Sequence, residues 1–164
     1  MEFAFYVAAA VALAATVMVV TRLDAVHALL YLVVSLLAIA LVLYTLGAPF
    51  AAALEVILYA GAIVVLFVFV VMMLNLGRVA LAQERRWLAP RTWIGPGLLA
   101  LVLLVELLAV LGPTPPVQPG AISAQAVGAA LFGRYLLGVE IASMLLLAGL
   151  VGACHLGRRT TEGT

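Results

Sequence analysis

Three glutamates lie inside strongly apolar stretches of this sequence: Glu55, Glu106 and Glu140. A charged side chain at the centre of a membrane helix costs about 2.5–3.5 kcal/mol on insertion scales, so each glutamate needs a partner, a proton or water. Intramembrane glutamates form proton relays in pumps and transporters. Glu55 and Glu140 are therefore candidates for a proton path. The alternative for both is a hydrogen bond to a neighbouring chain, without proton transfer.

Two residues near Glu55 could act with it. Tyr59 follows by four residues, which places its hydroxyl on the same face of a helix, within reach of a hydrogen bond or a shared water. A tyrosine with an already satisfied hydroxyl is the simpler interpretation. Gly61 removes a side chain and makes the helix locally easier to deform.

Glu106 is interpreted differently. It lies less than two turns before Gly112, where a proline-rich segment must end the helix. Its side chain could reach the membrane interface from there. A structural role is therefore expected for Glu106.

One long apolar run must position Glu55, Tyr59 and Gly61. From residue 52 to residue 74 a helix would extend roughly 35 Å, at about 1.5 Å per residue. That length is enough to cross the hydrocarbon of a bilayer. The run is therefore predicted to be a membrane-spanning helix with a polar middle.

The composition extends this interpretation to the whole chain. Of 164 residues, 68% are hydrophobic and 9% are charged, whereas soluble domains carry about 25% charged residues. We predict an all-α integral membrane protein with five transmembrane helices, forming a single membrane domain over residues 1–164. The predicted helices cover residues 3–20, 25–46, 52–74, 93–111 and 135–155.

The connecting segments carry turn and charge signals. Gly47-Ala48-Pro49 is predicted to be an uncharged tight turn. Residues 77–91 form a polar loop, and residues 112–120 form a proline-rich loop. The apolar segment 121–132 is predicted to contain a short interfacial helix capped by Ser123.

The arginines predict the orientation in the membrane. All eight basic residues are arginine, and seven of them fall in alternate loops, leaving only Arg134 on the other side. Positive charge accumulates on the cytoplasmic side. The N-terminus is therefore expected outside, in the periplasm, and the C-terminus in the cytoplasm.

Small residues indicate close helix contacts. Gly138 and Ala142, then Gly149 and Ala153, are each four apart on the fifth span, and the first span is rich in alanine. His27 is expected to be solvated at a span end. The spacing of the small residues is suited to packing within the chain as well as to contact with partners.

Several function classes are disfavoured. A net charge of +1 argues against nucleic-acid binding. One cysteine allows no intrachain disulfide framework, and no metal-ligand set, phosphate loop or nicotinamide motif is recognisable. No cofactor is expected on this chain. A small independent proton-coupled transporter is a third alternative, which the lack of lysine and the odd number of spans disfavour.

The run from Leu54 to Asn75 resembles the third helix of subunit J of bacterial NADH:quinone oxidoreductase, respiratory complex I. The mitochondrial counterpart is subunit 6 of NADH dehydrogenase. Residues 27–32, 83–88 and 142–150 are similar as well, so the likeness covers nearly the whole chain.

The resemblance implies a membrane-arm subunit of a proton-pumping translocase in the bacterial inner membrane. Electrons would pass from NADH through FMN and iron–sulfur clusters to quinone elsewhere in the complex. The implied partners are the lipid bilayer, the small K and A subunits, the quinone-site H subunit and the antiporter-like subunits. A purely structural or assembly subunit of the same complex is the alternative.

The resemblance also concerns the middle of the third span. In the family, the residues matching Tyr59 and Gly61 lie where this helix forms a π-bulge. The hypothesis is a gate between α and π registers, with Tyr59 and Gly61 at the pivot and Val65 and Phe67 as the plug. The alternative is a static bulge that only fits the packing.

Overall fold

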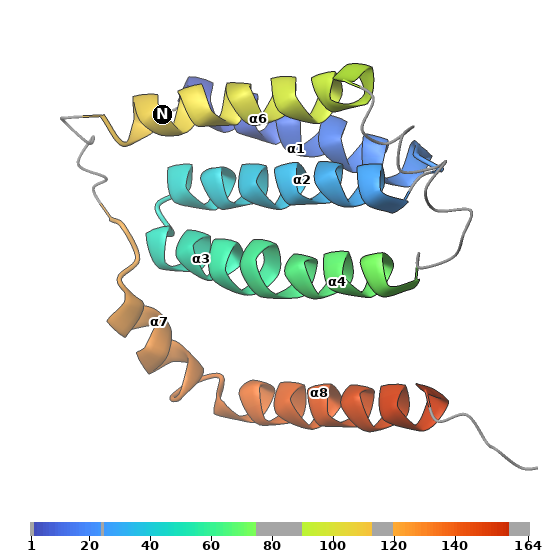
Figure 1. Ribbon diagram of the computed structural model, residues 1–164. Helices are drawn as coiled ribbons and strands as arrows, with labels where there is room; N and C mark the ends of the chain where they lie inside the picture. Colours follow the sequence, from blue (N-terminus) through green and yellow to red (C-terminus); the bar gives the residue numbers. More distant parts are fainter. Residues whose placement is uncertain (1, 24, 75–89, 113–119, 158–164) are drawn as a thin grey trace, which may run out of the picture. The chain divides into compact units, whose positions relative to one another are not determined.

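The computed structural model describes residues 2–23, 25–74, 90–112 and 120–157 (Figure 1). Within these ranges every regular element is a helix. In chain order they are α1 (Glu2–Thr21), α2 (Ala25–Thr45), α3 (Pro49–Leu54), the π-helix η1 (Glu55–Ile63), α4 (Val64–Leu74), α6 (Pro90–Val110), α7 (Ala124–Leu131) and α8 (Leu136–Gly157).

Five helical segments of the described chain are long and apolar enough to cross a membrane: Glu2–Thr21, Ala25–Thr45, Pro49–Met73, Trp93–Val110 and Leu136–Gly157. The predicted five spans are thereby confirmed, with ends that differ by a few residues. Of the predicted polar loop 77–91, only residues 90 and 91 are among the described residues. Of the proline-rich loop 112–120, only Gly112 and Gly120 are.

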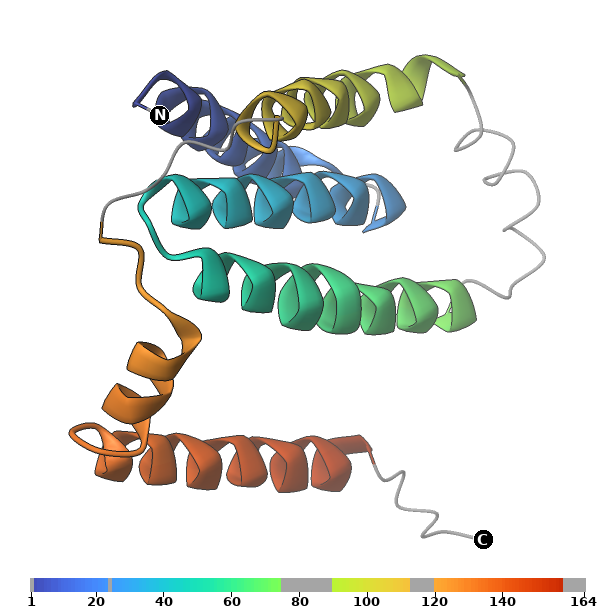
Figure 2. The ribbon, with the colours of Figure 1, turned by 90° about the vertical axis from the view of Figure 1, so that its left-hand side faces the viewer.

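The chain divides into two compact units, residues 1–122 and residues 123–164. In the first unit, α2 lies between the α1–α6 pair on one side and the third span on the other (Figures 1 and 2). In the second unit, α7 contacts α8.

The core of the first unit is built from small residues. Its cluster combines α1, α2 and α6 through Ala8, Val11, Ala15, Val34, Ala38, Leu41 and Leu103. Ala8, Ala15 and Ala38 are fully buried, so the backbones of α1 and α2 approach closely. The alanine-rich first span is therefore a packing surface within the chain.

The predicted turn at Gly47 and the predicted helix cap at Ser123 are both observed. Gly47 adopts a φ of 82°, the left-handed conformation that favours glycine, and Ala48 donates its N–H to the Leu43 carbonyl, closing α2. The Ser123 hydroxyl accepts a hydrogen bond from the Ala126 N–H at 3.2 Å and caps α7.

A close approach between α2 and α6 gives a stability prediction. A Cβ added at Gly95 would collide with the Tyr31 hydroxyl, whereas one added at Gly97 would meet nothing within 4 Å. Overpacking of this kind costs about 1–3 kcal/mol. Gly95→Ala should therefore lower the thermal unfolding temperature of the detergent-solubilised protein.

Gly97→Ala is the matched control and should leave the unfolding temperature unchanged or slightly raised, because alanine favours helix over glycine by about 1 kcal/mol. Adding Tyr31→Phe to Gly95→Ala should restore part of the loss. Equal unfolding temperatures for the two alanine variants would contradict the close approach.

Candidate functional site

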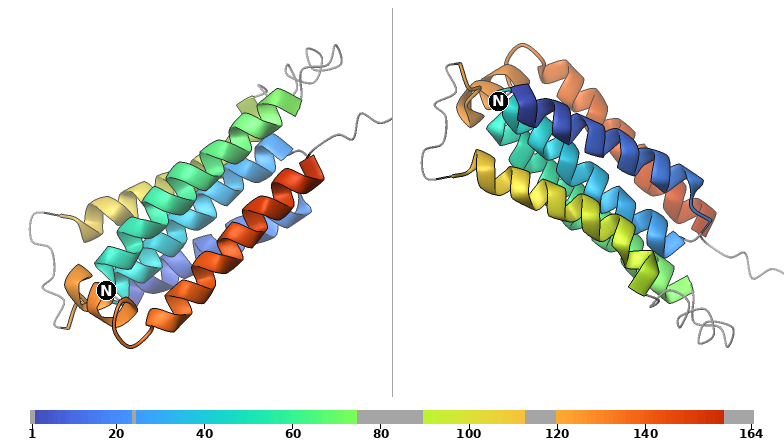
Figure 3. Two further views of the ribbon diagram at one scale, coloured as in Figure 1. Left: turned by 90° about the horizontal axis from the view of Figure 1, so that it is seen from below. Right: turned by 90° about the horizontal axis from the view of Figure 1, so that it is seen from above.

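The third span changes helix type in its middle. α3 continues into η1, which is nine residues long, and η1 continues into α4. At its end the Val64 N–H donates to the Tyr59 carbonyl, five residues back, which is the π-helical spacing. Figure 3 shows the three segments following one another as a single rod. The π-helical turn that the resemblance implied is therefore present.

Gly61 lies inside this π-helix. A Cβ added there would lie 3.2 Å from the carbonyl oxygen of Val56, five residues earlier. A side chain at this position would therefore press on the backbone of the wide turn. Glycine removes that contact, and it also lowers the preference for the regular α-helix by about 1 kcal/mol relative to alanine.

The π-helix determines where the following side chains point. A π-bulge contains one extra residue relative to the α-helix. One residue of an α-helix corresponds to about 100° of rotation. A change between the two registers would therefore turn Val65 and Phe67 by roughly that angle.

The structure brings Glu55 and Tyr59 onto the same element without joining them. Glu55 is half-buried and Tyr59 is 49% exposed. Among the hydrogen bonds of the described residues there is none between the carboxylate and the phenol hydroxyl. A link between the two groups would therefore run through water or a third polar group.

The plug candidates face away from the chain's own bundle. Val65 is 60% exposed and Phe67 is 51% exposed, and η1 itself contains no buried residue. Val64, between η1 and the plug, is 2% exposed. The third span is thus buried at Ala52 and Val64, while the plug candidates that follow Val64 are exposed.

Glu140 lies in the other unit, on α8, and its side chain is exposed. The Ser143 hydroxyl donates to the main-chain carbonyl of Glu140 at 2.7 Å and not to its carboxylate. Ser143 therefore leaves the Glu140 carboxylate free to interact with another group.

Glu106 differs from its sequence-based interpretation. It is 8% exposed, and both carboxylate oxygens are buried without a hydrogen-bond partner among the described residues. It lies three residues after Leu103 and four before Val110, and both of these are buried. The helical repeat therefore turns Glu106 into the bundle, and the prediction that it could reach the interface is wrong.

The buried polar face of α2 was also missed. His27 is 4% exposed, so the expectation that it is solvated is wrong. Tyr31 and Ser35 follow at intervals of four and are buried as well. The Ser35 hydroxyl lies 2.8 Å from that of Thr16, which ties α2 to α1.

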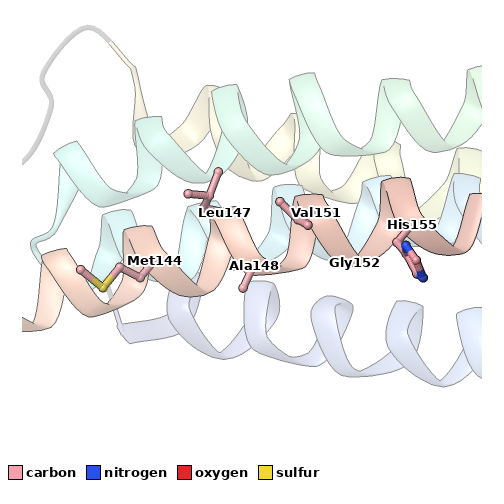
Figure 4. Close-up of a pocket in the computed structure, with 6 residues that line it drawn as sticks. All are labelled: Met144, Leu147, Ala148, Val151, Gly152 and His155. Atoms are coloured by element: carbon pink, nitrogen blue, oxygen red, sulfur yellow. The ribbon is translucent and has the colours of Figure 1, made fainter.

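α8 carries a shallow apolar groove along one face, shown in Figure 4. The groove forms where Ala148 and Gly152 are small, and the larger side chains border it. The lining residues are Met144, Leu147, Ala148, Val151, Gly152 and His155. A surface with small residues four apart is suited to close contact with another helix.

The described residues include no group of three or more His, Cys, Asp or Glu side chains that could hold a metal ion. The polar groups of the site are thus single carboxylates, hydroxyls and backbone groups.

The comparisons with known proteins decide the family. The profile described as NADH-ubiquinone/plastoquinone oxidoreductase chain 6 matches residues 15–156. The chain belongs to this family. The NADH-quinone oxidoreductase subunit J of Pseudomonas aeruginosa is 63% identical, with 99% of each chain covered. That of Escherichia coli K12 is 58% identical over 99% of this chain and 90% of its own length. The subunit J of Rhodobacter capsulatus is 38% identical over 96% of this chain and 81% of its own length.

Membership in the chain 6 family makes this protein a subunit of NADH-quinone oxidoreductase, respiratory complex I. The resemblance seen in the sequence is thereby confirmed. The five spans agree with a membrane subunit of that complex.

Proposed function

We propose that this chain contributes part of the proton path of NADH-quinone oxidoreductase and carries no redox centre of its own. The observation that supports this most is the nine-residue π-helix in the middle of a membrane span. π-Helical turns are rare and occur frequently at functional sites. This one begins at Glu55, the carboxylic acid residue of that span.

The path is completed by other subunits. The third span and α8 are the spans least buried within the chain, with 6% and 0% of their apolar windows buried. Glu55 and Glu140 lie on these two spans. Lipid cannot satisfy a carboxylate, so both glutamates and the α8 groove face neighbouring membrane-arm subunits. The K, A, H and antiporter-like subunits are the proposed neighbours, in the inner membrane.

The gate works through the register of η1. In the π register the apolar side chains after Gly61 point in one direction. In the α register they are rotated by about 100° around the helix axis. Val65 and Phe67 then either fill or vacate the space beside a polar group of a neighbouring subunit. Water enters when they leave, and the path becomes dry when they return. Turnover of quinone reduction would drive the exchange between registers.

A purely structural subunit, in which the bulge is static, is the second candidate. The exposed, closely spaced small residues of α8 favour a subunit that binds neighbours tightly, and such a subunit needs no change of register. The two proposals differ in whether titration of Glu55 or Glu140 matters for pumping.

Replacing both glutamates separates these proposals. In Glu55→Gln and Glu140→Gln, singly and together, the amide retains hydrogen bonding but cannot exchange a proton. Proton pumping per electron should fall severalfold while the complex still assembles, and Glu→Asp variants should lose less. Acidification by inverted membrane vesicles and NADH oxidation are measured in the same sample. Together they give the number of protons pumped per electron. Full pumping by the double variant would leave both residues a structural role only.

The orientation is proposed from the arginine asymmetry, with the N-terminus outside. Leu23, between α1 and α2, and Leu46, after α2, are both exposed in the chain. With Cys154 replaced by alanine, a cysteine at 23 should react with an impermeant thiol reagent only from the cytoplasm. A cysteine at 46 should react only from the periplasm. The reverse pattern would contradict the proposed orientation.

A further inference from the structure

A buried carboxyl group in the first unit has no role in the proposed path. Glu106 on α6 is 8% exposed, and neither of its carboxylate oxygens has a hydrogen-bond partner among the described residues. Glu55, by contrast, is half-buried, and Glu140 is exposed on α8. The burial of Glu106 is due to the chain itself and requires no partner subunit.

The surroundings of Glu106 are apolar. α6 contacts α1 and α2, and these helices contribute Ala8, Val11, Ala38 and Leu41 to the shared core. On α6 itself, the buried neighbours on the same face are hydrophobic. None of these side chains can hydrogen-bond or neutralise a carboxylate. The backbone of Ala8 on α1 lies near Glu106 but carries no net charge.

Among the described residues of the packed helices, no ionisable group provides a positive charge at this end of the bundle. On α1 the ionisable groups are Glu2 and Tyr6, both exposed. On α2, Tyr44 lies towards the same end. His27 and Tyr31 lie at the other end, where the Tyr31 hydroxyl is beside Gly95 of α6. Gly95 is eleven residues before Glu106, which is about 16 Å along the helix.

An ionised carboxylate without a partner in such an environment is far less stable than the neutral acid. We propose that Glu106 binds an exchangeable proton at neutral pH, forming a proton-binding site between α1, α2 and α6 that is separate from the third span. Glu106 lies four residues before Val110, where α6 ends. Water therefore needs to penetrate only about one turn to exchange this proton. The inference does not rest on the gate proposed for η1.

A hydrophobic carbodiimide tests the protonation state directly. Its reaction requires the acid form: the acid proton moves to a carbodiimide nitrogen while the carboxyl oxygen bonds to the central carbon. The O-acylisourea then rearranges to a stable N-acylurea that retains the whole reagent. The intact complex is treated with dicyclohexylcarbodiimide in acidic and neutral buffer, and adducts are located by peptide mass spectrometry.

Glu106 should be labelled to a similar extent in both buffers, and Glu106→Gln should remove the adduct. Glu2, which is exposed, is the internal control. An ordinary glutamate is protonated in roughly one molecule in 500 at neutral pH, so labelling of Glu2 should fall by about 100-fold or more. Labelling of Glu106 that falls in parallel with that of Glu2 would overturn the proposal.

A second measurement applies if no adduct forms at Glu106 in either buffer. Infrared spectra of the wild-type complex and of Glu106→Gln are then compared in water and in deuterated water. The wild type should show a carboxylic-acid C=O band that the variant lacks and that shifts on deuteration. Glu106→Asp should retain a band at a shifted position. The absence of the band, or a band insensitive to deuteration, would contradict an exchangeable proton.

Discussion

A strain that lacks this chain is expected to lose NADH-driven proton pumping completely, together with most of the assembled membrane arm. Its third span and α8 are each almost entirely unburied within their own units, and both carry a glutamate inside the span. Surfaces of this kind are covered by neighbouring subunits. Removing the chain exposes the matching surfaces of those neighbours and leaves their polar groups without partners.

The measurement is acidification by inverted membrane vesicles supplied with NADH, compared with the amount of intact complex on a native gel. A plasmid copy of the wild-type gene should restore both. Wild-type pumping in the deletion strain would show that the chain does not act in the complex.

Gly61→Leu is expected to lower quinone reduction and proton pumping together, by about tenfold, without loss of assembly. A Cβ at this position already comes within 3.2 Å of the Val56 carbonyl oxygen in the π register. Crowding costs about 1–3 kcal/mol, and 1.4 kcal/mol changes an equilibrium tenfold. Leucine also favours the regular α-helix over glycine. Both effects reduce the population of the π register.

Gly97→Leu is the matched control, because a Cβ at Gly97 meets nothing within 4 Å in this chain. It should pump like the wild type. Gly61→Ala should have an intermediate effect, since it adds the Cβ alone. Normal pumping by Gly61→Leu at normal assembly would mean that the bulge is static.

The helices could be predicted from the sequence because each span is a continuous apolar run bounded by a turn or a charge. The predicted segment 25–46 ends one residue after α2, which runs from Ala25 to Thr45. Local signals such as the positive φ of Gly47 and the Ser123 cap depend only on neighbouring residues. These features need no knowledge of the tertiary packing.

The directions of the polar side chains could not be predicted in the same way. Glu106 was assigned to the interface from its distance to the helix end, but the face of α6 decided its position. His27 was placed in solvent for the same reason and is buried. In a chain that is apolar on all sides, hydrophobic periodicity does not identify the inner face. The π-helix was implied only by the resemblance, and its nine-residue length was not predicted.

The proposed gate requires that η1 change register during turnover. This change can be measured directly in structures of the intact complex, one at rest and one during NADH oxidation, with the register of residues 55–67 assigned in each. We expect a π-helix in one state and an α-helix in the other, with Val65 and Phe67 turned by about 100° between them. The same register in every state resolved would contradict the proposed gate.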